Sequence, residues 1–159
     1  MSGFDRILVS TDFSRASTAA IEYACGLADA LDASLCILHT VENPYPMVGH
    51  AEFGSLPQHV FDRMEHYAQA HLATALTPEQ VRRYRATLVL CRGVAAQEIL
   101  RYVQEHGDIS LIVMATHGRG AVARLMLGSV ADKVVRAAPC PVLTIRVPDA
   151  GDSTTSRAA

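Results

Sequence analysis

Residues 111–130 read LIVMATHGRGAVARLMLGSV and join a strand pattern to a turn with glycines and a helix start. The opening letters, LIVMA, form the continuous apolar run that is typical of a strand buried on both faces. Gly118 and Gly128 flank the turn, and Ser129 opens a helical pattern. Backbone N–H groups beside glycine can approach an anion closely, and a helix N-terminus adds partial positive charge. The stretch therefore predicts a phosphate-binding turn after a buried strand.

The glycine spacing differs from two common phosphate motifs. Gly118 and Gly120 lack the third glycine of the dinucleotide fingerprint, and they lie late in the chain rather than after its first strand. No Walker lysine is present, since the only lysine is Lys133. From spacing alone, an ordinary turn followed by an ordinary helix start is an equal alternative.

Strand and helix patterns alternate along the rest of the chain. Helical spacing relates Ala20, Ala24, Leu27 and Leu31, which predicts that they form the inward face of the first helix. Further apolar runs predict strands at residues 6–10, 34–41, 85–91 and 142–147. This alternation is typical of one parallel sheet with helices on both faces, where ligands bind beyond the carboxyl ends of the strands.

Length and composition favour one globular domain. The 159 residues are 50% hydrophobic, and their formal net charge is -2. We expect a domain at residues 1–148, with a small, polar and disordered tail at residues 149–159. No apolar stretch approaches the ~20 residues of a membrane span, and the N-terminus has no signal-peptide core, so we expect a cytoplasmic protein. The dispersed basic residues do not form a nucleic-acid footprint.

Single side chains give further expectations. The four cysteines are far apart in sequence and lack a C-x-x-C pair, so we expect buried, reduced thiols. His39 ends an apolar run and is expected to be a hydrogen-bonded core residue. The long connection from Glu42 to Gln58 is a candidate flap over a ligand.

Several segments resemble the universal stress protein family. That family has a pattern of glycine, two residues, glycine, nine residues, then glycine and serine or threonine; here Gly118, Gly128 and Ser129 match it, and Ala115 replaces the first glycine. The likeness continues in residues 6–14 (RILVSTDFS), 37–40 (ILHT) and 139–143 (PCPVL). The resemblance implies an α/β fold with an open five-stranded parallel sheet of order 3-2-1-4-5, Rossmann-like and of the HUP type.

The resemblance also implies an adenine-nucleotide site, with ATP bound across the first and fourth strand ends and accompanied by Mg²⁺ or Mn²⁺. Asp12 would face the ribose or a phosphate-bound metal ion, with helix capping as an equal alternative. Thr40 would meet the adenine through its backbone. Arg119 would contact phosphate or remain solvated. The full set of expected nucleotide-binding residues is Ser10, Thr11, Asp12, Thr40, Met114, Ala115, Gly118, Arg119, Gly128, Ser129 and Val130.

Ala115 bears on whether nucleotide binding is retained. With ordinary strand angles the alanine adds only a methyl group, whereas a positive φ would strain it by about 1 kcal/mol or more. We expect ordinary angles because Ala115 ends a regular apolar strand. The alternative function is a family member that has lost nucleotide binding and acts only as a dimeric interaction protein.

The resemblance implies a regulatory role in a stress response, and we expect binding rather than catalysis, with at most slow ATP hydrolysis. His117 adjoins the turn, but no carboxylate neighbours it in sequence, so no catalytic residue is assigned. The last strand, Val142 to Val147, is expected at a sheet edge, where apolar strands pair with a second copy, and the resemblance implies such homodimers. A charge on Leu143 or Ile145 would then yield monomers.

Overall fold

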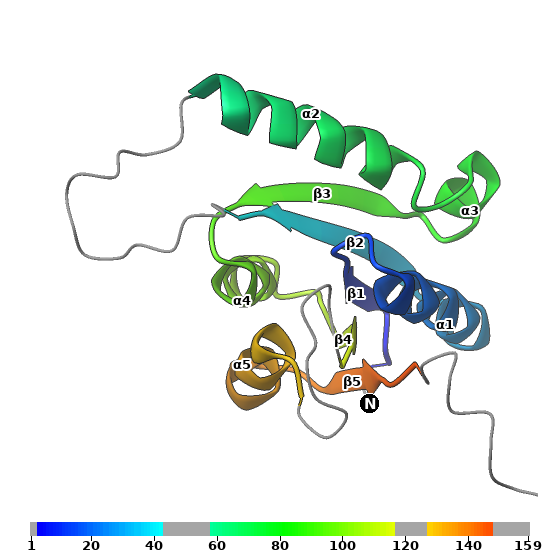
Figure 1. Ribbon diagram of the computed structural model, residues 1–159. Helices are drawn as coiled ribbons and strands as arrows, with labels where there is room; N and C mark the ends of the chain where they lie inside the picture. The colour runs from blue at the N-terminus through cyan, green and yellow to red at the C-terminus, as the bar shows by residue number, and fades with distance from the viewer. Residues whose placement is uncertain (1–2, 43–57, 117–126, 148–159) are drawn as a thin grey trace, which may run out of the picture.

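The computed structural model describes residues 3–42, 58–116 and 127–147, which contain one five-stranded sheet of order β3-β2-β1-β4-β5 (Figure 1). All four strand pairings are parallel. The strands are β1 (Arg6–Ser10), β2 (Ser34–Val41), β3 (Thr87–Arg92), β4 (Leu111–Ala115) and β5 (Val142–Ile145). The helices are α1 (Arg15–Leu31), α2 (Gln58–Ala73), α3 (Pro78–Arg83), α4 (Ala95–Glu105) and α5 (Ser129–Ala137). The predicted sheet and its strand order are confirmed.

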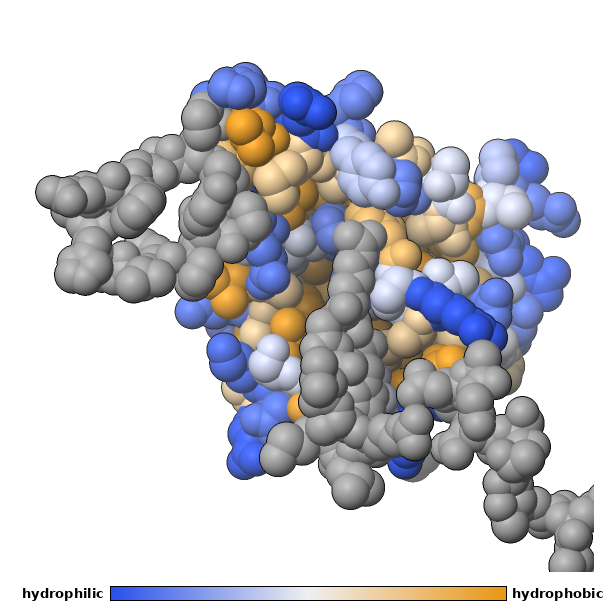
Figure 2. Space-filling model, in the orientation of Figure 1, coloured by the Kyte–Doolittle hydropathy of each residue, from blue (hydrophilic) through white to orange (hydrophobic). Residues whose placement is uncertain are grey.

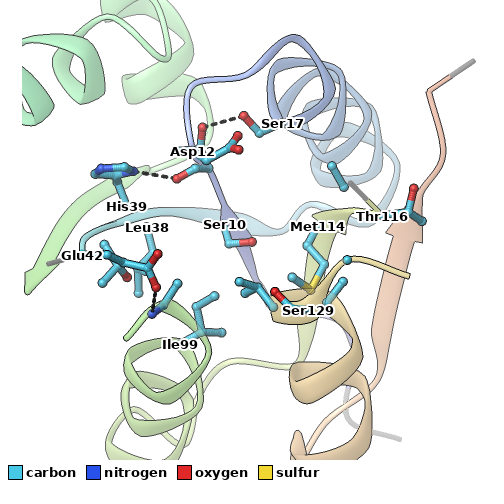
Figure 3. Close-up of a pocket in the computed structure, with 17 residues that line it drawn as sticks. Ser10, Asp12, Ser17, Leu38, His39, Glu42, Ile99, Met114, Thr116 and Ser129 are labelled. Atoms are coloured by element: carbon cyan, nitrogen blue, oxygen red, sulfur yellow. Dashed lines mark hydrogen bonds between the residues drawn. The ribbon is translucent and has the colours of Figure 1, made fainter. Parts of the chain in front are cut away.

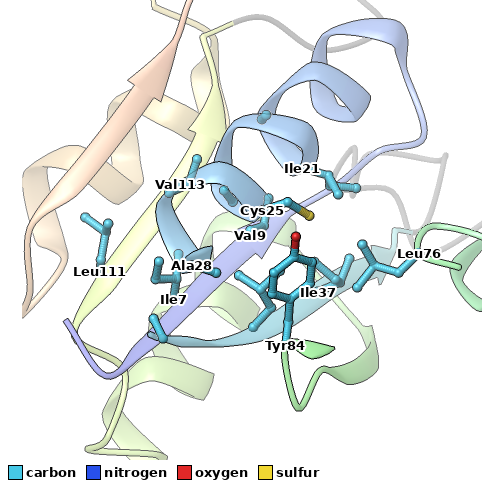
Figure 4. Packing of buried hydrophobic residues seen from close by; sticks show 14 of the residues in the cluster. Ile7, Val9, Ile21, Cys25, Ala28, Ile37, Leu76, Tyr84, Leu111 and Val113 are labelled. Atoms are coloured by element: carbon cyan, nitrogen blue, oxygen red, sulfur yellow. The ribbon is translucent and has the colours of Figure 1, made fainter. Parts of the chain in front are cut away.

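Helices cover both faces of the sheet, which explains the continuous apolar runs of the central strands. On one face, Ile7 and Val9 of β1 point toward Cys25 and Ala28 of α1 (Figure 4). On the other face, Leu8 packs in a second cluster with residues of α4 and α5. In Figure 2 hydrophilic residues lie mostly toward the outline of this view, and hydrophobic residues show toward its middle.

Local sequence signals begin two of the helices. Ser14 is the N-cap of α1, and its Oγ accepts the N–H of Ser17 at 3.2 Å. Thr77 and Gln80 form a reciprocal capping box at α3, with Pro78 in the first turn. Both helices therefore begin at a residue whose side chain caps them.

Some expectations require correction. Leu31 is 42% exposed instead of facing the core, because it is the last residue of α1 and the buried stripe of that helix ends at Ala28. β3 begins at Thr87 instead of residue 85, because the φ of Arg85 is 46° and extended pairing cannot include it. β5 ends at Ile145.

The cysteine side chains are free thiols. Cys25 and Cys36 are buried as expected, whereas Cys91 and Cys140 are half-buried. Burial raises the pKa of each thiol, which favours the protonated form at neutral pH.

Three expectations lie outside the described residues: the disordered tail, the flap between Glu42 and Gln58, and the glycine turn after β4. Among the described helices, none combines the length and the apolar character needed to cross a membrane.

The turn between β3 and α4 requires glycine. Gly93 has a φ of 149°, and a Cβ added there would lie 2.8 Å from Glu98 Oε1. We expect Gly93→Ala to lower the free energy of unfolding by about 1–3 kcal/mol, measured by urea denaturation. The matched variant is Gly107→Ala, whose Cβ would meet no atom within 4 Å. An equal loss in both variants would contradict this assignment.

Candidate functional site

A pocket of about 440 Å³ opens at the carboxyl ends of β1, β2 and β4 (Figure 3), within the usual size range of small-molecule sites. The starts of α4 and α5 complete its walls through Ala95 and Ser129. Parallel strands bring their carboxyl ends to the same sheet edge, which explains why segments distant in sequence meet here.

Nine of the eleven expected nucleotide-binding residues line this pocket: Ser10, Thr11, Asp12, Thr40, Met114, Ala115, Gly128, Ser129 and Val130. Gly118, Arg119 and His117 lie outside the described residues. The strand ends and the start of α5 thus come together as expected.

Hydrogen bonds fix the β1–α1 turn at the pocket. Thr11 Oγ1 lies 3.0 Å from Ser17 Oγ and also accepts the N–H of Phe13 at 3.0 Å. Asp12 Oδ1 accepts the N–H of Ser14 at 3.0 Å. Asp12 therefore braces the turn while lining the pocket, and Ser14 is the residue that caps α1.

Phe13 adopts a φ of 63°, which is uncommon for a bulky residue and is found mainly where the surroundings enforce it. The ring of His39 stacks on Phe13 with centroids 4.2 Å apart. His39 Nδ1 lies 2.7 Å from the carbonyl oxygen of Thr11, and because a carbonyl only accepts, Nδ1 donates. The contacts hold the ends of β1 and β2 together. His39 is hydrogen-bonded as expected, but it is half-buried on the pocket wall instead of lying within the core.

Three helix N-termini border the pocket, and two are capped by side chains. Ser14 caps α1, and Glu42 Oε1 accepts the N–H of Ala95 at the start of α4 at 2.6 Å. Gly128 is the N-cap of α5, and it makes no side-chain capping bond. The first N–H groups of a helix have no partner within it, and the helix dipole adds positive potential there. The start of α5 is therefore suited to bind an anion.

The backbone of Ala115 is ordinary. It continues the parallel ladder opposite Ile145, and it is not among the described residues with positive φ. Its methyl group packs against the core cluster on the α1 side. The replacement of glycine at this position therefore causes no backbone strain, which was the expected case.

Sequence reasoning did not identify several pocket residues, among them Glu42, Ser17, Ala95 and Ile99. Glu42 directly follows β2. Because ligands in such sheets bind beyond the strand ends, its place at the pocket could have been predicted. Ala95 and Ile99 offered no comparable signal, because their role depends on where α4 docks against the sheet.

Comparison with known proteins gives one consistent result. Residues 3–146 match the model of the universal stress protein family. A universal stress protein of Thermus aquaticus is 35% identical over 144 residues, which cover 90% of this chain and 99% of the relative. The structure of UspA from Lactobacillus plantarum matches with a TM-score of 0.76 at 27% identity, over 92% of this chain and 100% of that one.

A universal stress protein solved in complex with cAMP also has the same fold. Its TM-score is 0.63 at 23% identity, and the match covers 91% of this chain and 98% of that chain.

Proposed function

The chain belongs to the universal stress protein family, and we propose that it is a member that binds ATP in the pocket at the carboxyl ends of β1, β2 and β4. The observation that carries this proposal is the start of α5, which borders the pocket and whose N-cap, Gly128, has no side chain to cap it. The solved relative in complex with cAMP supports an adenine nucleotide as the ligand class.

The phosphates would bind at α5. Ser129 and Val130 belong to its first turn and line the pocket, so their N–H groups and the Ser129 hydroxyl can donate to phosphate oxygens. Gly118 and Arg119 remain proposed phosphate contacts from the sequence pattern alone. Met114 and Ala115 would border the ribose or first phosphate from the end of β4.

A divalent cation would accompany the nucleotide. Mg²⁺ or Mn²⁺ bound with ATP is held largely by phosphate oxygens and water, with few protein ligands. Asp12 supplies a carboxylate on the pocket wall, beside Ser10 and Thr11 at the end of β1. Its oxygen ligand type fits such an ion, and we propose Asp12 as the protein contact.

We propose a regulatory role in stress response rather than a catalytic one, with at most slow hydrolysis of ATP. The three titratable side chains among the described residues of the pocket support this view, because each bonds a backbone group. Asp12 accepts from Ser14, His39 bonds the Thr11 carbonyl, and Glu42 accepts from Ala95.

Calorimetric titration of the purified chain with ATP and Mg²⁺ tests the proposal. Saturable binding with one site per chain is the expected result. A folded protein that binds no ATP would overturn it and leave a dimeric interaction protein as the function, the alternative that Ala115 raised from sequence.

We further propose a homodimer formed through the β5 edge. β5 is the last strand in the order of the described sheet. The N–H of Ile112 donates to Pro141 O at 3.0 Å, and that of Thr116 donates to Ile145 O at 2.9 Å. Successive residues of a strand direct their N–H and C=O groups to opposite sides. Since Pro141 and Ile145 direct theirs toward β4, those of Thr144 point away from β4. They are placed to pair with a second copy.

The geometry of β5 makes Thr144 a better position for a test substitution than Leu143 or Ile145. Leu143 and Ile145 pack against the core of their own chain on the α1 side, so a charge on either would disturb the fold as well as the edge. The only backbone hydrogen-bonding group that Thr144→Pro removes is an outward N–H, and proline is compatible with an edge strand.

We expect Thr144→Pro to convert the dimer to a monomer with an unchanged circular dichroism spectrum, as measured by light scattering coupled to size exclusion. Thr144→Ala is the control, since it retains the N–H and should remain dimeric. If Thr144→Pro is folded and still dimeric, β5 is not the interface.

A further inference from the structure

Thr40 carries a buried hydroxyl without a hydrogen-bond partner. The residue is 8% exposed, and its Oγ1 is the only buried side-chain nitrogen or oxygen without a partner in residues 3–42, 58–116 and 127–147. Nearly all buried polar atoms in folded proteins are hydrogen-bonded, so an exception on a pocket wall requires a specific explanation.

The strand pattern directs Thr40 toward the α4 side of the pocket. Side chains alternate along β2, so Ile37 packs against the α1 side whereas Leu38 packs against the side of α4 and α5. Thr40 lies two residues after Leu38 and therefore faces the same side of the sheet, and it lines the pocket together with Ile99 of α4. Figure 3 shows Leu38 and Ile99 on the side of the pocket opposite Thr116.

Other hydroxyls at this sheet edge are satisfied by the protein. Thr11 Oγ1 pairs with Ser17 Oγ at 3.0 Å, and Ser17 Oγ also donates to the carbonyl oxygen of Ser14 at 3.0 Å. Valine has nearly the same branched shape as threonine, so it would fill this space equally well without burying a polar atom. Packing therefore does not explain a threonine at this position.

We infer that the Thr40 hydroxyl hydrogen-bonds the base of the bound nucleotide, an inference that rests on the proposed function. Leu38, Ala95 and Ile99 supply apolar walls at this end, which suit the faces of an aromatic base. A hydroxyl both donates and accepts, so it can pair with a ring nitrogen or the amino group of adenine. Thr40 then reads the base through its side chain, beyond the backbone contact expected from sequence.

Thr40→Val tests this role because it deletes the hydroxyl and keeps the branched shape. We expect the affinity for ATP to fall about 5- to 10-fold, the effect of losing one neutral hydrogen bond. We expect the Tm of the ligand-free protein to stay equal or to rise by about 2–4 °C, since a buried unpaired hydroxyl is removed. Titration calorimetry and thermal unfolding measure the two effects.

Two further measurements make the test specific. Thr40→Ser retains the hydroxyl and loses a methyl group, so it should bind ATP within about twofold of the wild type despite a lower Tm. Inorganic tripolyphosphate, which has no base, should bind to wild type and Thr40→Val equally in competition with ATP. A merely structural Thr40 would instead give ATP affinities that follow the order of stability.

The outcomes separate the two proposals. Wild type that binds ATP together with Thr40→Val that binds it equally well would overturn the inference and leave the proposed function intact. An equal loss of ATP and tripolyphosphate affinity in Thr40→Val would overturn the base contact. A folded wild type that binds no ATP would overturn the proposed function and this inference with it.

Discussion

Gly128→Glu should weaken ATP binding at least 100-fold while the protein stays folded. A glutamate at the N-cap of α5 places a carboxylate where the phosphates are proposed to bind, so it repels them and competes for the same N–H groups. Two like charges about 4 Å apart near a protein surface interact by about 4 kcal/mol, and 100-fold in affinity corresponds to about 3 kcal/mol. Titration calorimetry with ATP and Mg²⁺ gives the affinity.

The fold should tolerate this substitution because Gly128 has a φ of -57°, which any residue can adopt. A carboxylate near a helix N-terminus is favourable, so the Tm of the ligand-free variant should not fall. Loss of binding without loss of stability would identify Gly128 as a ligand position. It would also show that the fold does not need glycine there for its backbone conformation.

Gly26→Glu is the matched control. Gly26 is exposed on α1, and a Cβ added there would meet no atom within 4 Å. The control carries the same added charge away from the pocket and should bind ATP with wild-type affinity. Unchanged affinity in Gly128→Glu would remove the start of α5 from the site, and equal losses in both variants would indicate an effect of net charge.

The central strands could be predicted from sequence because burial on both faces gives them an unambiguous signature. Residues 35–38 and 111–115 are continuously apolar, and β2 and β4 have the expected bounds. Periodicity carries no information on which strands are neighbours. The order 3-2-1-4-5 came from the family resemblance, whose residues span most of the chain.

The pocket could be predicted in part for the same reason. Ser10 and Ala115 end strands that pair with neighbours in a parallel sheet, so their proximity follows from topology alone. The bond from Ala95 N–H to Glu42 joins residues 53 apart in sequence, and the position of α4 decides it. The sequence also could not predict that the Thr40 hydroxyl is unpaired, because this depends on the positions of all polar atoms around it.

Leu31 shows where helical periodicity fails. Spacing of three and four residues places it on the same face as Ala24 and Leu27, but a face is buried only as far as the opposing surface extends. Asp32 adopts a φ of 52° at the C-cap, which ends α1 immediately after Leu31. The leucine is left at the rim of the sheet with 42% of its surface exposed.

The same Leu→Ala substitution at a buried and at an exposed leucine tests whether packing decides the contribution of each leucine to stability. We expect Leu8→Ala to lower the free energy of unfolding by about 2–5 kcal/mol, because Leu8 is fully buried in the central strand beneath α4 and α5. We expect Leu31→Ala to change it by less than about 1 kcal/mol. The chain has no tryptophan, so urea unfolding is best followed by far-ultraviolet circular dichroism.

Both variants must be compared with wild type at one protein concentration, because the proposed dimer would couple stability to concentration. A loss of 2–5 kcal/mol is a large part of the roughly 5–15 kcal/mol that stabilises a domain, so Leu8→Ala should unfold at a much lower urea midpoint with a similar slope. Equal losses in the two variants would mean that Leu31 is buried in solution. That result would indicate a covering partner at the end of α1, since the chain's own sheet does not reach it.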